Sequence, residues 1–137
     1  IKNRFALYAY GIIKDTSKNV LLTGCAGSGK TLLLKHIIKT IKKNTLVLAP
    51  TGAAAMNVKG ITIHRFLGLH SFNAATDRNI VLRKLKSNSI EIIKSLQVLI
   101  IEEISMVRAD LLDLIDYIFR IIRDVDESFG GIQIVLC

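Results

Sequence analysis

The chain has 137 residues, half of them hydrophobic, and carries a formal net charge of +8. This length is enough for one domain with a hydrophobic core, and the absence of an apolar run long enough to cross a bilayer argues against a membrane-spanning chain. The two cysteines, Cys25 and Cys137, lack the spacing of a metal or redox motif, so we expect free thiols in a reducing intracellular compartment.

Short apolar runs alternate with helical patterns along the chain, which is typical of an α/β domain built on a parallel sheet. The predicted strands are 20–23, 45–49, 98–101 and 132–136. The predicted helices are 3–13, 30–43, 52–58, 89–96 and 108–123. We expect the first helix to pack at the sheet edge, and the polar segment 71–88 to form an excursion on the surface.

The segment from Gly24 to Thr31 matches the phosphate-binding pattern G-x-x-x-x-G-K-[ST]. Its glycines let the backbone curl and aim N–H groups at phosphates, and the helix that follows presents its positive N-terminus. Lys30 is placed to reach the β- and γ-phosphates, and the Thr31 hydroxyl to bind Mg²⁺. The expected nucleotide-binding residues are Gly24, Cys25, Ala26, Gly27, Ser28, Gly29, Lys30 and Thr31.

Two carboxylates, Glu102 and Glu103, follow the apolar strand predicted at 98–101 in a Walker B arrangement. Ligands of doubly wound sheets bind at the carboxyl ends of strands, so both acids are expected beside the phosphate loop. We assign Glu102 to hold Mg²⁺ with Thr31, and Glu103 to polarise the attacking water. Lys30, Glu102 and Glu103 are thus the expected catalytic residues; the alternative is an acidic strand end that only faces solvent.

A third group of residues follows the second predicted strand. Thr51 and Gly52 begin a predicted helix, and His64, Arg65 and Phe66 follow a little later. Residues 1–101 hold 16 Lys and Arg against 3 Asp and Glu, whereas residues 102–137 hold 3 against 8. A basic platform with an aromatic side chain suits a single nucleic-acid strand. Solvated lysine-rich helices and a structural histidine would give the same pattern.

Four sequence blocks together resemble the PIF-one-like DNA helicases, the 5′-to-3′ branch of superfamily one related to RecD. In chain order the blocks are Leu22–Thr31, Pro50–Ala55 with Gly60–Gly68, Ile101–Val107, and Phe129–Gln133. The resemblance spans nearly the whole chain. It implies a RecA-like P-loop fold, with the last predicted strand between the phosphate-loop strand and the Walker B strand.

The resemblance also implies an activity and its cofactors. It implies an ATP- and Mg²⁺-dependent helicase that translocates on single-stranded DNA and unwinds duplexes at junctions, in genome maintenance such as repair, recombination or telomere maintenance. Thr51 and the His64 region would contact the DNA strand. Residues 1–137 would be part of the first of two motor domains of a monomeric protein of the nucleus, mitochondrion or cytoplasm, with no membrane partner. Alone they would bind nucleotide weakly and would not unwind DNA.

Three positions depart from the family pattern. Glu102-Glu103 stands where the family usually has Asp-Glu, and Arg65 stands where Ser is common. The glutamine that reads adenine is absent from residues 1–5, and the glutamine that senses the γ-phosphate would lie beyond Cys137. Two alternatives follow: a nucleotide- and DNA-binding module without motor activity, or another kind of P-loop ATPase, such as a small-molecule kinase.

Overall fold

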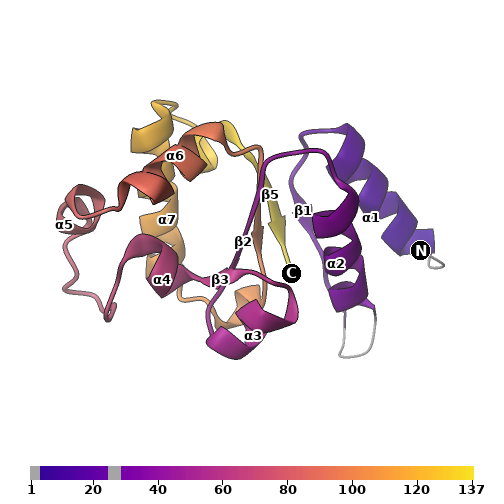
Figure 1. Ribbon diagram of the computed structural model, residues 1–137, viewed down its shortest axis with the longest axis horizontal. Helices are drawn as coiled ribbons and strands as arrows, with labels where there is room; N and C mark the ends of the chain where they lie inside the picture. Colours follow the sequence, from indigo (N-terminus) through magenta and orange to yellow (C-terminus); the bar gives the residue numbers. More distant parts are fainter. Residues whose placement is uncertain (1–3, 25–28) are drawn as a thin grey trace.

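All strand pairs of the sheet are parallel in the computed structural model, which describes residues 4–24 and 29–137 (Figure 1). The strands are β1 (Val20–Leu21), β2 (Thr45–Ala49), β3 (Ile61–Thr62), β4 (Val98–Ile101) and β5 (Gln133–Leu136). Their spatial order is β1-β5-β4-β2-β3. The last strand therefore lies between the phosphate-loop strand and the Walker B strand, which confirms the implied order.

Helices lie on both faces of this sheet (Figure 1). On one face are α1 (Arg4–Asp15) and α2 (Lys30–Thr40). On the other side are α4 (Ile63–Leu67), α5 (Arg78–Arg83), α6 (Ser87–Ser95) and α7 (Ala109–Arg123). The short helices α3 (Gly52–Asn57), η1 (Ile104–Met106) and η2 (Ser128–Gly131) complete the described chain. None of the described helices is both long and apolar enough to span a membrane.

The alternation of side chains along the strands creates two hydrophobic clusters, one under each helical layer. In β4, Leu99 and Ile101 belong to the cluster around α7, whereas Val98 and Ile100 belong to the cluster under α1 and α2. All four are fully buried. This explains why the central strands read as continuous apolar runs in the sequence.

The polar segment 71–88 is more than a surface excursion. It contains α5 and the start of α6, and its Val81 and Leu85 are buried in the cluster around α7. Asp77 caps α5, because its Oδ1 accepts a hydrogen bond from the Asn79 backbone N–H at 2.9 Å. The apolar side chains of α5 are the adjacent Ile80, Val81 and Leu82, which do not recur at helical spacing and so give too weak a pattern to predict this helix.

Two other differences from the predicted elements have local causes. The helix predicted over 30–43 ends at Thr40, and Lys43 beyond it donates hydrogen bonds from Nζ to the carbonyl oxygens of Ile13 and Thr16, both at 2.7 Å. Lys43 thus satisfies carbonyl groups at the end of α1. The strand β3 was not predicted, since two residues are too few to show alternation.

The turn between α7 and β5 requires glycine at Gly130. Its φ is +66°, and a Cβ there would lie 2.8 Å from the carbonyl oxygen of Phe119 in α7. Arg123 also reaches this turn, because its Nε donates to the Gly130 carbonyl oxygen at 2.9 Å. The turn is therefore packed directly against α7.

We expect Gly130→Ala to destabilise the protein more than Gly68→Ala does. Gly68 also has a positive φ, of +71°, but faces open space, so alanine there costs about 1 kcal/mol for the left-handed conformation alone. The clash at Gly130 adds roughly 1–3 kcal/mol. Thermal unfolding of the two variants measures the difference, and equal midpoints would contradict the close packing of this turn.

Candidate nucleotide and nucleic-acid site

Lys30 begins α2 directly after the phosphate-loop segment. The predicted loop residues Cys25, Ala26, Gly27 and Ser28 lie outside the described residues. On either side of them, Gly24 has φ 149° and Gly29 has φ 90°, conformations that favour glycine. Lys30 Nζ donates a hydrogen bond to the Gly24 carbonyl oxygen at 2.9 Å. The ammonium group is thus held at the backbone of Gly24.

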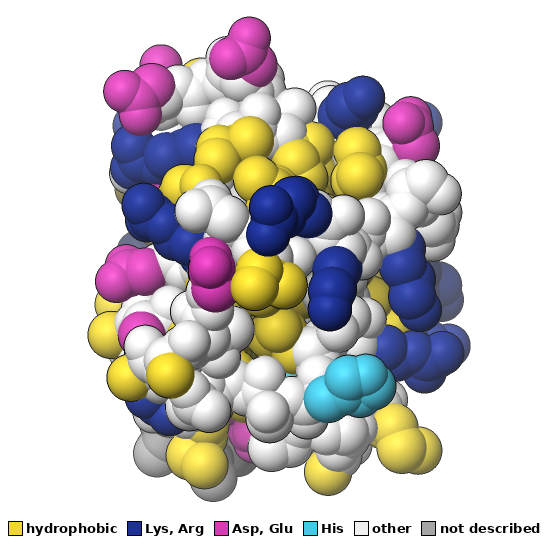
Figure 2. Space-filling view, turned by 90° about the vertical axis from the view of Figure 1, so that its left-hand side faces the viewer, with side chains coloured by type: hydrophobic (Ala, Val, Ile, Leu, Met, Phe, Trp, Pro, Cys, Tyr) yellow, Lys and Arg dark blue, Asp and Glu magenta, His cyan; other side chains and the backbone are white. Residues whose placement is uncertain are grey.

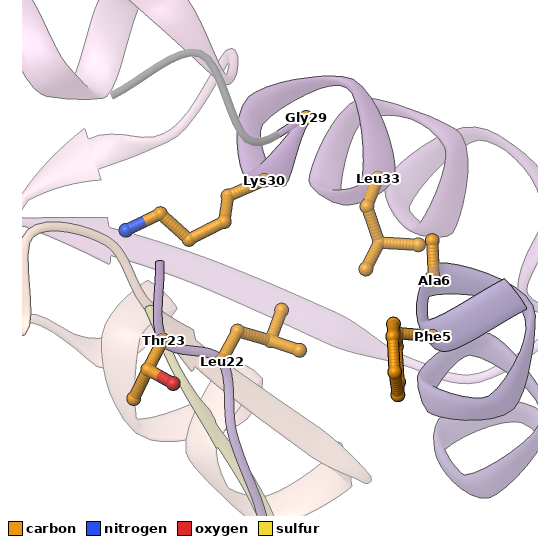
Figure 3. Close-up of a pocket in the computed structure, with 7 residues that line it drawn as sticks. All are labelled: Phe5, Ala6, Leu22, Thr23, Gly29, Lys30 and Leu33. Atoms are coloured by element: carbon orange, nitrogen blue, oxygen red, sulfur yellow. The ribbon is translucent and has the colours of Figure 1, made fainter. Parts of the chain in front are cut away.

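A cavity of about 280 Å³ opens beside Lys30, between α1, the end of β1 and the start of α2. It is lined by Phe5, Ala6, Leu22, Thr23, Gly29, Lys30 and Leu33. Figure 3 shows the apolar side chains gathered on one side and the Lys30 amino group extending to the other. This arrangement offers apolar surface to a flat ring and a cation to phosphate. Sequence reasoning missed the lining role of Phe5, whose only signal is an aromatic side chain at the start of a helix.

Glu102 and Glu103 lie at the carboxyl end of β4, as expected from the sequence. The backbone of Cys137, directly after β5, forms hydrogen bonds to the residues on either side of this pair. The Cys137 N–H donates to the Ile101 carbonyl oxygen at 3.0 Å, and the Ile104 N–H donates to the Cys137 carbonyl oxygen at 2.9 Å. Glu103 has φ 53° and ψ 49°, so the chain turns sharply between these two bonds. The backbone that carries both carboxylates is thus held against the end of β5.

The surroundings of Glu102 disfavour its negative charge. Burial raises the pKa of Glu102 above its ordinary value of 4.5, while a hydrogen bond with the Cys137 thiol lowers the pKa, nearby Glu103 raises it, and Lys30 lowers it. Burial, with the charge of Glu102, raises the pKa of Cys137 to about 11. The thiol is therefore protonated at neutral pH and can donate to the carboxylate. These effects place Lys30, Glu102 and Cys137 in one electrostatic neighbourhood.

The donor set fits a magnesium ion. Glu102 Oε2 is buried and has no hydrogen-bond partner among the described residues, and such an oxygen is costly unless a cation or water meets it. Thr31, exposed in the first turn of α2, supplies a second hard oxygen. No cluster of three or more His, Cys, Asp or Glu suited to a metal occurs in the described part of the chain. Mg²⁺ is usually held by one or two protein oxygens together with phosphates and water, and the oxygens of Glu102 and Thr31 are of this kind.

The residues predicted to contact DNA lie at the carboxyl ends of β2 and β3. Thr51 caps α3 by accepting a hydrogen bond from the Ala54 N–H at 3.2 Å. In the same way, Thr62 caps α4 by accepting a hydrogen bond from the Arg65 N–H at 3.1 Å. Since β2 and β3 are paired, the two caps are neighbours. Thr51, Gly52 and Arg65 are exposed and His64 is half-buried. The parallel sheet thus brings these four residues to the same edge as Glu102, the edge formed by the carboxyl ends of the strands.

Phe66 corrects one expectation from the sequence. Its side chain is only 4% exposed and belongs to the cluster around α7. The ring faces the core because Ile63, Phe66 and Leu67 form the buried side of α4. Phe66 therefore offers no ring face to a nucleic-acid base, and the aromatic part of the expected platform is wrong.

Comparison with known proteins identifies relatives of this fold and site. The family model described as PIF1-like helicase matches residues 3–137. The chain is 37% identical over 130 residues to the ATP-dependent DNA helicase PIF1 of Saccharomyces cerevisiae (strain YJM789), covering 91% of this chain and 15% of the relative. The chain spans less than a fifth of the length of such curated relatives, 15% and 19% in two cases.

Solved structures agree with this result. The Pif1 helicase from Candida albicans superimposes with a TM-score of 0.90 at 34% identity, covering 100% of this chain and 32% of that one. Bacteroides Pif1 bound to ssDNA has a TM-score of 0.87 at 40% identity, and the match covers 99% of this chain and 31% of that one. Bacteroides sp Pif1 in complex with ADP-AlF4 has a TM-score of 0.86 at 39% identity, with the same coverage of 99% and 31%. The predicted RecA-like P-loop fold is therefore confirmed.

Replacing Glu102 by glutamine tests the electrostatics of this site. Because burial raises the pKa of Glu102 above 4.5, the folded state binds the proton more tightly than the unfolded chain, and stability falls as pH rises through that window. At pH 7 the ionised carboxylate destabilises the ligand-free fold. We expect ligand-free Glu102→Gln to melt at a higher temperature than the unaltered protein at pH 7, with a difference that shrinks as the pH falls toward 4.5.

The same variant should lose most of the Mg²⁺-dependent part of its affinity for ADP, measured by calorimetry with and without the ion. Glu91→Gln, at an exposed position on α6, is the matched control and should change neither property. A Glu102→Gln protein that melts lower at pH 7 and keeps its Mg²⁺ dependence would contradict this placement of Glu102.

Proposed function

The chain belongs to the PIF1-like helicase family, and we propose that the protein of which it forms part is an ATP-dependent DNA helicase. One observation carries the proposal. Lys30, which begins α2, and Glu102, which follows β4, lie in one electrostatic neighbourhood, and Glu102 Oε2 has no hydrogen-bond partner among the described residues. This is the arrangement that a triphosphate and its Mg²⁺ require.

Each residue of the nucleotide site has a proposed role. Lys30 binds the β- and γ-phosphates, and leaves the Gly24 carbonyl oxygen to do so. Thr31 and Glu102 hold Mg²⁺, which neutralises charge on the phosphates, and Glu103 orients the attacking water. The loop between Gly24 and Gly29 supplies backbone N–H groups. The apolar cavity beside Lys30 takes the base and ribose, with Phe5 providing a ring face; Phe5 is 82% exposed.

The DNA strand is proposed to cross the edge formed by Thr51, Gly52, His64 and Arg65. A relative, Bacteroides Pif1, has been solved bound to ssDNA, which supports single-stranded DNA as the ligand. Arg65 adds a phosphate contact, because this basic residue of the short helix α4 is exposed. The whole protein would contain a second motor domain, act as a monomer on single strands and junctions, and work where cells keep DNA: nucleus, mitochondrion or cytoplasm.

We expect the full-length protein to hydrolyse ATP faster in the presence of single-stranded DNA. Lys30→Ala should reduce the DNA-stimulated rate by roughly 100-fold or more, since it removes the cation that binds the transferred phosphate. Lys35→Ala, an exposed lysine on the same helix, should keep the unaltered rate. An ATPase rate that does not change when single-stranded DNA is added would count against a helicase. Phosphorylation of a small metabolite would favour a kinase.

Glu102→Asp tests whether this unusual Walker B residue supports full activity. The Glu102 carboxylate already lies against Cys137 and near Lys30, so a side chain shorter by one methylene would withdraw it from the metal. We expect the ATPase rate to fall roughly 10- to 100-fold, while Glu91→Asp leaves it unchanged. A large gain in rate would mean that the natural site is attenuated, and would favour a binding module without motor activity.

A further inference from the structure

The turn between α5 and α6 carries an exposed basic cluster. Arg83, Lys84 and Lys86 are all exposed, whereas Leu85 between them is buried in the cluster around α7. Because Leu85 points inward, its neighbours are turned to solvent. We call Arg83, Lys84 and Lys86 the basic ridge.

The basic ridge lacks the carboxylate partners that neutralise other cations on this side of the molecule. On α7, Arg120 contacts Asp116 at 3.0 Å and Asp126 at 3.1 Å. Just before α7, Arg108 contacts Asp110 at 2.7 Å. Within the described chain, no ion pair involves Arg83, Lys84 or Lys86. Like charges held close together repel, and a polyanion relieves that repulsion.

A buried hydrogen bond ties the ridge to the edge proposed for DNA. Ser89, in the first turn of α6, is 7% exposed, and its hydroxyl donates to the Phe66 carbonyl oxygen at 2.9 Å. This bond fixes the start of α6, directly after Lys86, against α4. Arg65 is the neighbour of Phe66 and is exposed. The ridge is therefore held beside α4, the helix that contributes His64 and Arg65 to the proposed DNA edge.

Figure 2 shows the face of the molecule that carries α5. In Figure 2, Lys and Arg side chains extend across the middle and right of the face that carries α5, and a histidine lies below them. The lower end of this view is the side toward which the strands point in Figure 1. Acidic side chains gather mainly toward the left and upper borders of the face.

We propose that the basic ridge is a second contact for the DNA backbone, which binds phosphates of the strand after it leaves the Thr51–Arg65 edge. This inference rests on the proposed function. Side chains of Lys and Arg on a convex turn suit phosphates rather than base edges, so the contact is independent of sequence. It adds affinity and salt dependence and lengthens the strand that one protein molecule occupies.

The test compares two triple variants of the full-length protein that remove equal charge. Arg83→Gln/Lys84→Gln/Lys86→Gln removes the ridge, and Lys35→Gln/Lys39→Gln/Lys42→Gln removes exposed lysines in and just after α2, on the opposite helical layer. Binding of oligothymidylates of increasing length is measured over a series of KCl concentrations. Each lost phosphate contact lowers the slope of log K against log salt by about 0.7.

We expect the ridge variant to lower that slope by about 2 on long oligomers, to weaken binding there by roughly tenfold or more, and to match the unaltered protein on the shortest oligomers that bind. The α2 variant should follow the unaltered protein at every length. Equal behaviour of the two variants, or a ridge effect that does not depend on length, would overturn the proposal. If the ridge triple variant does not fold, Lys84→Gln alone should lower the slope by about 0.7.

This design separates the inference from the proposed function. If the unaltered protein binds oligothymidylate and the ridge variant binds it equally well, the ridge proposal is wrong while the helicase assignment stands. If the unaltered protein binds no single-stranded DNA, both are wrong.

Discussion

The pairing of β4 with β5 is the constraint on which the site depends. It carries Cys137 to the end of the Walker B strand, where the Cys137 backbone bonds to Ile101 on one side of the carboxylate pair and to Ile104 on the other. Glu102 is thereby held next to a protonated thiol and close to Lys30. The cost is a buried carboxylate oxygen without a partner among the described residues. A site that is unfavourable when empty favours the ligand that neutralises it.

The same sheet places the proposed nucleotide and DNA sites at one edge. β2 and β4 are adjacent, so Thr51 and Glu102 follow neighbouring strands, and Glu102 N–H donates to the Leu48 carbonyl oxygen at 2.9 Å. The proposed nucleotide and DNA sites thus follow adjacent, hydrogen-bonded strands of one sheet.

The sequence predicted most of the sheet because strands buried on both faces are continuous apolar runs, and it placed the carboxylate pair at the carboxyl end of β4 because the pair directly follows such a run. The phosphate loop remains a prediction from its spacing, since residues 25–28 lie outside the described residues. The sequence could not show that Cys137 brackets Glu102, since a contact between the ends of two strands depends on their order in space. It also placed Phe66 in the DNA site, whereas the helical phase of α4 turns the ring into the core. The helix α5 was not predicted because its apolar residues are adjacent in the sequence and do not recur at helical spacing.

The most direct test is a crystal structure of the full-length protein with Mg²⁺, ADP-AlF4 and an oligothymidylate. We expect the metal between Thr31 Oγ1 and the Glu102 carboxylate, bound directly or through water, with Lys30 Nζ moved from the Gly24 carbonyl oxygen to the phosphate mimic. The DNA strand should lie over Thr51 and Arg65. A cation bound elsewhere, with Lys30 still on Gly24, would contradict the assignment of this edge as the site where nucleotide and DNA are coupled.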